Sequence, residues 1–453
     1  MDSLPRLLDI DPRIWIPLAA LLVIIALLAL LGKVPLSYVF GNLAVRWHTT
    51  FLTALAFTLV ISLLTVMLAF VNGMYALTKG SGHPENVIIL SEGATDEGFS
   101  NLGYGDVGEI ENQPGIARVD DKPLVSRETY IVVNQPIKNA PAGRPNRRFL
   151  QLRGIQDGNI AAAVHRIDLY PGGEWFSEAG VRERQEGTDT RPLIEVTIGE
   201  GIAREMGRDR QPEALATAKN AERLDVGDTF VLNDRTWLIT GVMQSSGSTF
   251  DSEVWGKQSL IGPLFGKETY STLVARAPTA ADAQTLQKFL TNDYKKSAIN
   301  AQVETEYFAK LSQTNVQFLF AIGVVTFFLA IGGMFGIMNT MFAAISQRIK
   351  DIGVLRLLGY RRRHILATFL LESAAIALVG GLLGCALGML FDGTSANSIV
   401  SSGPGGGKFV VLRLTVDNQT FAINMLLSLA MGLFGGLLPS IRAMRYTALE
   451  TLR

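Results

Sequence analysis

Six basic side chains gather in one stretch, Asn339 to Glu372, between two long apolar segments. They are Arg348, Lys350, Arg356, Arg361, Arg362 and Arg363, and only Asp351 and Glu372 oppose them. The chemistry open to such a cluster is ionic contact with another molecule, and a basic loop between apolar segments is typical of the cytoplasmic side of a membrane. Charge alone leaves two interpretations open: a docking site for a cytosolic partner, or a plain basic turn between two spans.

Apolar residues inside this stretch recur at helical spacing. Ile345, Ile349, Ile352 and Leu355 would lie on one face, which predicts that the preceding helix continues as an amphipathic extension. Gly353 and Gly359 are predicted to act as turns, and between them a short helix, Val354 to Leu358, is expected at the membrane surface.

A second candidate for chemistry is the glycine-rich run Ser402 to Phe409, which superficially resembles a phosphate-binding loop. Ser402 replaces the first required glycine, and Phe409 stands where Ser or Thr should follow Lys408. We therefore expect the whole segment from Asp392 to Thr420 to be a flexible external loop.

Metal and nucleophilic chemistry have little support in the sequence. His48, His83, His165 and His364 are too scattered to suggest a metal site, and the lone Cys385 has no intrachain disulfide partner. No complete nucleotide site or nucleophile motif with its base is recognisable, so we expect a non-catalytic chain that binds no cofactor itself. The formal net charge of +0 gives no indication of a nucleic-acid partner.

One acid, Glu372, falls inside a predicted membrane span. A carboxylate there either faces protein for structural reasons or serves as a proton or substrate site. Both interpretations remain open from the sequence.

Five apolar runs are long enough to span about 30 Å of hydrocarbon. They are Ile14 to Gly32, Thr50 to Leu77, Val316 to Ala343, Ile365 to Phe391 and Phe421 to Ile441. Lys33 to Thr49 is predicted to form an interfacial helix before the second span. The acids before the first run argue against a signal peptide, so we expect a retained helix whose N-terminus lies outside the cytoplasm.

The last three spans each carry two glycines four residues apart, a spacing that lets helix backbones approach closely. The pairs are Gly332 with Gly336, Gly384 with Gly388, and Gly432 with Gly436. We expect these glycines to pack helices together, within one chain or between chains.

Between the second and third spans, residues 79–314 are polar and interrupted by short β-like runs, which predicts an extracytoplasmic α+β domain. Its expected strands are Asn86 to Leu90, Thr129 to Val133, Arg148 to Arg153, Ile194 to Ile198, Thr229 to Leu232 and Thr236 to Val242. Its expected helices are Asp106 to Asn112, Ile202 to Met206, and Ala280 to Phe289 with Thr279 as N-cap. The predicted fold class is a polytopic α-helical membrane protein of about five transmembrane helices with a large inserted α+β extracytoplasmic domain.

The amino-acid sequence of the basic stretch resembles that of the permease subunits of ABC transporters in the FtsX, LolC and MacB group. The matching residues are Asn339-Thr340-Met341, Gln347-Arg348, the run Ile352 to Gly359, and the basic step that follows. Leu370 to Ser373 matches the Leu-Leu-Glu-Ser pattern of the same group. The domain between the second and third spans also resembles the MacB-type periplasmic core, for example at Pro114 to Ala117, Gly172 to Phe176 and Leu224 to Asp228.

This resemblance implies a permease in a bacterial inner membrane, with the large domain periplasmic and a coupling loop at 345–364. It implies a separate cytosolic ABC ATPase that uses ATP and Mg, and a homodimer or a heterodimer with a related permease. It leaves room for a periplasmic adaptor or outer-membrane partner. The expected ATPase-coupling residues are Arg348, Lys350, Asp351, Gly353, Leu355, Arg356, Gly359 and Arg361.

The implied function is to couple ATP hydrolysis to motion of the periplasmic domain, for export or extraction of a substrate that the sequence does not identify. An FtsX-like regulator that activates a periplasmic enzyme without transport remains the alternative, and a membrane scaffold with no ATPase is a third. The expected division is 1–33 for the extra N-terminal helix, 34–78 for the interfacial helix and second span, 79–314 for the inserted domain, and 315–453 for the remaining spans.

Overall fold

The computed structural model describes residues 11–31, 36–137, 146–186, 189–216, 218–244, 247–311, 313–400 and 408–446. The chain divides into two compact units. The helical unit holds Met1–Asn72, Phe318–Thr394 and Leu414–Arg453, and the sheet unit holds Gly73–Gln317 and Ser395–Arg413. The expected tail beyond Tyr446 lies outside the described residues.

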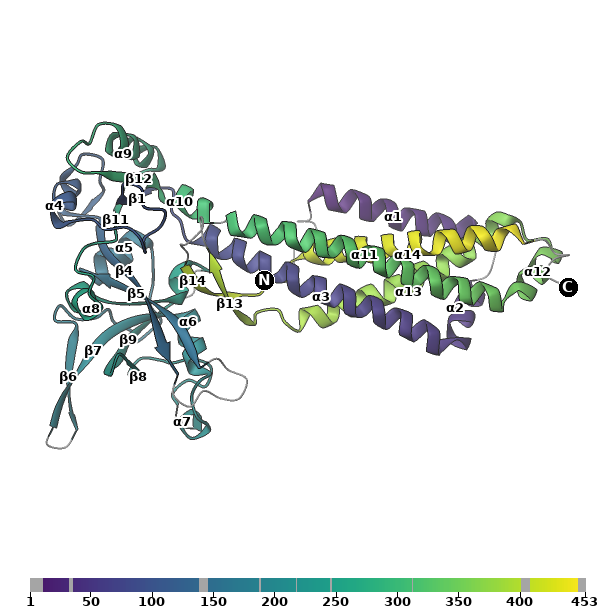
Figure 1. The fold of residues 1–453 in the computed structure, drawn as a ribbon, viewed down its shortest axis with the longest axis horizontal. Coiled ribbons are helices and arrows are strands. Elements are labelled where there is room, and N and C mark those ends of the chain that lie inside the picture. Colours follow the sequence, from purple (N-terminus) through teal and green to yellow (C-terminus); the bar gives the residue numbers. More distant parts are fainter. Residues whose placement is uncertain are drawn as a thin grey trace. The chain divides into compact units, whose positions relative to one another are not determined.

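Five helices in the described ranges are long and apolar enough to cross a membrane, and they confirm the five predicted spans (Figure 1). They are α1 Pro12–Leu31, α3 Trp47–Gly80, α11 Gln313–Gln347, α13 Arg362–Met389 and α14 Asn418–Arg445. A further helix, α2 Leu36–Val45, lies between the first two, as expected. At 1.5 Å per residue, even the 20 residues of α1 extend about 30 Å.

Two of the three predicted glycine pairs pack helices within the helical unit. A Cβ added to Gly384 would lie 2.7 Å from the Cβ of Ile61 on α3, and one added to Gly388 would also meet an α3 side chain. Gly432 and Gly436 of α14 lie equally close to side chains of α13. These four glycines therefore hold α13 between α3 and α14, since any larger residue would separate the helices.

The third pair behaves differently. A Cβ on Gly332 or Gly336 of α11 would meet no atom within 4 Å, and both glycines are exposed in this chain. They do not pack against another helix of the described chain, so for this pair packing between chains stays a prediction.

The sheet unit is built around one mixed sheet of ten strands. Nine strands follow the order β12-β1-β11-β4-β5-β10-β7-β9-β8, and β6 pairs with β7. β10 runs parallel to β5 and β7 parallel to β9, while the other neighbours are antiparallel. The sheet strands are β1 Asn86–Ser91, β4 Val125–Pro136, β5 Arg147–Ile155, β6 Val181–Glu186, β7 Asp189–Gly199, β8 Thr229–Leu232, β9 Arg235–Met243, β10 Glu253–Lys257, β11 Thr272–Arg276 and β12 Ile299–Val303.

Short elements connect and cover this sheet, which confirms the predicted α+β class (Figure 1). Beside the small ladder of β2 Arg118–Val119 and β3 Lys122–Pro123, they are α4 Tyr104–Val107, η1 Ile110–Asn112, α5 Gly158–His165, α6 Glu200–Gly207, α7 Pro212–Ala216, η2 Thr249–Ser252, α8 Gln258–Leu264, α9 Ala280–Asn292 and α10 Glu304–Leu311. The six predicted strands all fall within observed ones. Thr279 caps α9 as predicted, because its hydroxyl accepts a hydrogen bond from the Asp282 N–H at 3.2 Å.

The predicted helix Asp106 to Asn112 is wrong as one element. The structure divides it into α4 and the 3₁₀ turn η1, with Gly108 as the C-cap of α4. Glycine is a weak helix former, and here it separates two turns that the pattern alone joined.

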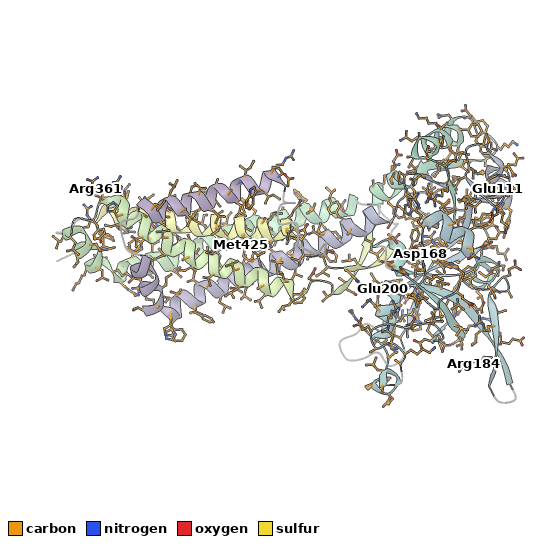
Figure 2. The ribbon with its side chains drawn as sticks, turned by 180° about the vertical axis from the view of Figure 1, so that it is seen from behind. Glu111, Asp168, Arg184, Glu200, Arg361 and Met425 are labelled. Carbon is orange, nitrogen blue, oxygen red and sulfur yellow. The ribbon has the colours of Figure 1, made fainter. Side chains whose placement is uncertain are left out.

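The expected flexible loop after α13 is also corrected. Ser395–Val400 (β13) and Lys408–Arg413 (β14) form an antiparallel hairpin that belongs to the sheet unit. The Val411 N–H donates to Ser252 Oγ at 2.8 Å, and Arg413 pairs at 3.1 Å with Glu200, which is labelled in Figure 2. The glycine-rich residues 401–407 lie outside the described residues.

Candidate coupling site

The basic stretch folds as a break followed by a short helix. α11 ends at Gln347, Arg348 leaves the helical conformation with φ −115° and ψ 18°, and α12 then runs from Ile349 to Leu357. The break therefore lies at Arg348, and Gly353 is a buried residue inside α12. The predicted short helix starts earlier than expected, and the role of Gly353 as a turn is corrected.

Gly359 does act as a turn. Its φ of +88° lies in the left-handed region that glycine adopts without strain. The Gly359 N–H donates to the Arg356 carbonyl and the Tyr360 N–H to the Leu355 carbonyl, each at 3.1 Å. These two bonds form a Schellman motif, which ends α12 and turns the chain toward α13.

α12 has one buried face and one exposed face. Ile352 is 1% exposed and belongs to the apolar core that includes Ile345 and Ile365, so it anchors α12 to the bundle. The half-buried Leu355 and Arg356 lie between the two faces. The predicted burial of Ile352 is confirmed, but the preceding helix does not continue as an amphipathic extension, because it ends at Gln347.

The exposed face carries apolar residues that the sequence reasoning did not single out. Val354, Leu357 and Leu358 are 49%, 62% and 71% exposed. Lys350 and Asp351 lie beside them and are exposed as well. An apolar patch bordered by charges is typical of a protein-binding surface. Leu357 and Leu358 follow Val354 by three and four residues, and this helical spacing could have revealed the exposed apolar face from the sequence.

The triple arginine lies where α13 begins. Arg361, Arg362 and Arg363 are all exposed, and Figure 2 shows Arg361 at the end of the bundle. The Arg361 N–H donates to His364 Nδ1 at 3.2 Å, which fixes the first turn of α13. The three side chains remain on the surface.

Arg348 has a different environment from the other basic residues. It is 7% exposed, and its Nη1 lies 2.8 Å from Oε1 of Glu372, which is itself 2% exposed. The structure therefore corrects the expectation that Arg348 contacts an ATPase, because its side chain is buried and paired within this chain. Of the two interpretations of Glu372, the contact supports the structural one.

The sheet unit contains a second concentration of charge, fully buried. Arg153 pairs with Glu253 at 2.6 Å, with Glu97 at 2.7 Å, and with Glu128. His165 Nε2 lies 2.6 Å from Glu128 Oε1. Burial disfavours the imidazolium, but the Glu128 and Glu304 carboxylates outweigh that effect and raise the pKa of His165 to about 9.

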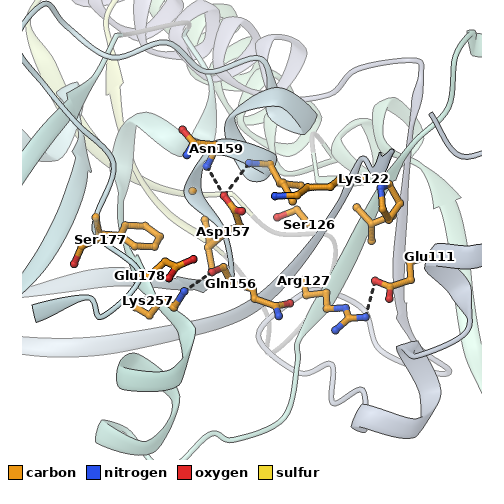
Figure 3. Close-up of a pocket in the computed structure, with 16 residues that line it drawn as sticks. Glu111, Lys122, Ser126, Arg127, Gln156, Asp157, Asn159, Ser177, Glu178 and Lys257 are labelled. Carbon is orange, nitrogen blue, oxygen red and sulfur yellow. Dashed lines mark hydrogen bonds and ion pairs between the residues drawn. The ribbon is translucent and has the colours of Figure 1, made fainter. Parts of the chain in front are cut away.

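A pocket of about 780 Å³ opens where β4 begins and β5 and β10 end (Figure 3). Arg127 pairs with Glu111 at 2.5 Å, Asp157 accepts the Asn159 N–H at 2.9 Å to cap α5, and Lys257 donates to the Gln156 backbone carbonyl at 2.8 Å. The described residues that line it include no His or Cys. Among the residues that the structure describes, no group of three His, Cys, Asp or Glu could hold a metal ion.

Two family models match the chain. The MacB-like periplasmic core domain matches residues 50–292, more than half of the chain, and the FtsX-like permease C-terminal domain matches residues 323–448. The second match contains α12 and the basic stretch.

Curated relatives agree with these two matches. The macrolide export ATP-binding/permease protein MacB of Shewanella sp. strain ANA-3 is 28% identical over 396 residues, which cover 84% of this chain and 57% of that protein. An uncharacterized ABC transporter permease of Methanocaldococcus jannaschii, MJ1507, is 27% identical over 237 residues, 51% of this chain and 58% of that protein. The chain thus spans less than two thirds of the length of these relatives.

The crystal structure of the extracellular domain of the transporter YknZ from Gram-positive bacteria overlaps 48% of this chain and 99% of that one. The TM-score is 0.32 and the identity 14%, and the family assignment does not rest on this overlap. The five apolar helices, the inserted domain and the two family matches lead to one assignment: the chain belongs to the FtsX-like, MacB-type ABC transporter permeases.

Proposed function

We propose that this chain is the membrane subunit of a complex in which a separate cytosolic ABC ATPase binds α12. ATP and Mg are used by that ATPase, and its hydrolysis cycle displaces α12. The displacement passes along the helical unit and moves the sheet unit, which drives export or extraction of a substrate.

One observation carries the proposal: the exposed apolar face of α12. Val354, Leu357 and Leu358 point away from the core that holds Ile352, so α12 is anchored on one side and open on the other. A helix with one buried and one exposed apolar face can bind a partner protein on the exposed side and transmit the partner's motion to the helical unit. Lys350, Asp351 and Arg361 would supply the polar rim of the contact.

The helices provide the geometry for transmission. α11 is one helix of 35 residues, about 50 Å long, and it connects the sheet unit at Gln317 with the break before α12. The basic stretch supports a cytoplasmic location for α12, and with it a periplasmic sheet unit in a bacterial inner membrane as part of the proposal. The open face at Gly332 and Gly336 on α11 supports a dimer with a second copy or a related permease. A periplasmic adaptor or outer-membrane partner would bind the sheet unit.

The test is purification of the full chain from its native membrane in mild detergent, followed by identification of the proteins that remain bound. An ABC ATPase at about equal stoichiometry is expected. Leu357→Glu should remove it, because a charge would enter the apolar contact. Val231→Glu is the matched control, since Val231 is 57% exposed in the sheet unit. Absence of an ATPase from the unaltered, intact protein would refute the proposed function.

A further inference from the structure

The break between α11 and α12 is held by contacts from two other helices. Arg348 is the residue at the break, and its guanidinium reaches Glu372 on α13 at 2.8 Å. Asn42 on α2 completes the contact: its side-chain Nδ2 donates to Glu372 Oε1 at 3.3 Å, and its backbone carbonyl accepts from Arg348 Nη2 at 3.4 Å. Residues from α2, the break before α12 and α13 therefore meet at one buried ion pair, and Asn42 is more than 300 positions from the other two.

A second contact lies directly beside the first. Arg46, which follows α2, donates from Nη2 to the Gln347 side chain at 2.5 Å. Gln347 is the last residue of α11 and Arg348 the residue after it. The segment around α2 thus holds both residues at which the long helix ends.

The Arg348–Glu372 ion pair is buried where an apolar contact could also hold the helices together. Replacing such a pair by apolar side chains is often neutral or stabilising, so stability alone does not account for it. Hydrogen-bonded charges differ from apolar contacts in being directional. Ile352 can hold α12 against the bundle, but an apolar contact does not fix the direction in which α12 leaves the break.

We propose that Arg348, Glu372 and Asn42 form a joint that fixes the direction of α12 relative to α13, and that α2 is thereby a working part of the coupling apparatus. This inference rests on the proposed function for its consequence in the cycle. Glu372 and Asn42 are positioning residues: they touch no substrate and act through Arg348. With the joint intact, a displacement of α12 is transmitted to α13 and α2. Without it, α12 turns about Arg348 and the displacement is lost.

The decisive variant is Arg348→Met combined with Glu372→Met. It leaves no unpaired buried charge, so the protein is expected to fold, yet the directional contacts are gone. Asn42→Ala is the second variant, which removes one partner and keeps the ion pair. Asn424→Ala is the matched control, because Asn424 donates to Thr65 Oγ1 at 2.9 Å in a buried interhelical contact elsewhere in the bundle.

The first readout needs no ATPase. Spin labels on Leu357→Cys and Val45→Cys, in a Cys385→Ala background and diluted with unlabelled protein, report the distance between α12 and the end of α2. We expect a narrow distribution for the otherwise unaltered chain and for Asn424→Ala. The double methionine variant should give a broad distribution, and Asn42→Ala an intermediate one. A narrow distribution in the double variant would overturn the joint.

The second readout is the ATPase complex itself. The double methionine variant should bind the ATPase as well as the unaltered chain does, because the exposed face of α12 is untouched. Its stimulation of ATP hydrolysis should fall by about tenfold, within the range by which residues between two sites modulate their coupling. Full stimulation by the double variant would also overturn the inference. If the unaltered chain binds no ATPase, the proposed function fails, and the distance readout still decides the joint.

Discussion

His165 and Glu128 face each other inside the sheet unit, with Nε2 and Oε1 2.6 Å apart and both side chains at most 1% exposed. His165 also lies 3.6 Å from Glu304 through Nδ1, and Glu128 accepts from Arg153. These carboxylates raise the pKa of the His165 imidazole to about 9, so it is charged at neutral pH. The core of the sheet unit therefore contains a group that loses its charge at mildly alkaline pH.

This contact predicts how the stability of the sheet unit depends on pH. The pKa of His165 is about 9 in the folded protein against an ordinary value of 6.5, so its stabilising contribution is complete below about pH 6.5 and is lost as the pH rises toward 9. Hydrogen exchange of β4 amides in the intact protein, corrected for intrinsic pH dependence, should show easier opening over that interval. His165→Gln should remove this dependence. An unchanged dependence in the variant would exclude His165 as its source.

Arg153 is predicted to be the most costly single residue to remove from the same cluster. Arg153→Met leaves Glu97, Glu128 and Glu253 buried without their guanidinium partner, which should destabilise the sheet unit by about 3–5 kcal/mol. Proteolysis of the intact protein in increasing urea measures this loss. Lys296→Ala is the control, because its pair with Glu109 is exposed and should change nothing measurable. Equal behaviour of the two variants would contradict the prediction.

The two kinds of glycine in the helices should respond differently to a larger side chain. Gly384→Leu would drive a side chain into Ile61 of α3 and should cost about 1–3 kcal/mol, seen as a lower unfolding temperature in detergent. Gly332→Leu enters open space in the single chain and should leave that temperature unchanged while weakening self-association. A large loss of stability in the monomeric Gly332→Leu chain would be inconsistent with the described packing.

Charge at the edge of α12 should matter for coupling. Arg356→Glu places an acid beside the exposed apolar face and should reduce both ATPase binding and stimulated hydrolysis. Arg184→Glu is a matched charge reversal on the exposed strand β6 of the sheet unit, labelled in Figure 2, and should leave both intact. Normal binding and stimulation by Arg356→Glu would refute its assignment to the contact.

The membrane helices and six of the ten strands in the main sheet could be predicted from the sequence because their signals are local. A run of apolar residues long enough for the bilayer identifies α3 or α14, and a short run rich in β-branched and aromatic residues identifies β9. The Schellman turn at Gly359 was predictable for the same reason, since only the chemistry of one glycine is involved.

Contacts between distant segments could not be predicted in this way. Asn42 and Glu372 are 330 positions apart, and no local pattern reveals that they meet. A turn was expected at Gly353, because glycine is a weak helix former. The structure instead keeps α12 helical through Gly353, next to the buried Ile352, and the helix break lies at Arg348. The β13–β14 hairpin was missed because its neighbouring glycines suggested a loop, although Phe409 to Leu412 form a short β-type run.

The most direct test of the central claim is photocrosslinking from the exposed face of α12. A photoreactive amino acid at Leu357 or Leu358, incorporated in the full chain in native membranes, is predicted to crosslink to an ABC ATPase, and the yield should change when a non-hydrolysable ATP analogue is added. The same probe at Val231 in the sheet unit should give no such product. Failure of both α12 positions to capture an ATPase, with the chain intact in the membrane, would contradict the account.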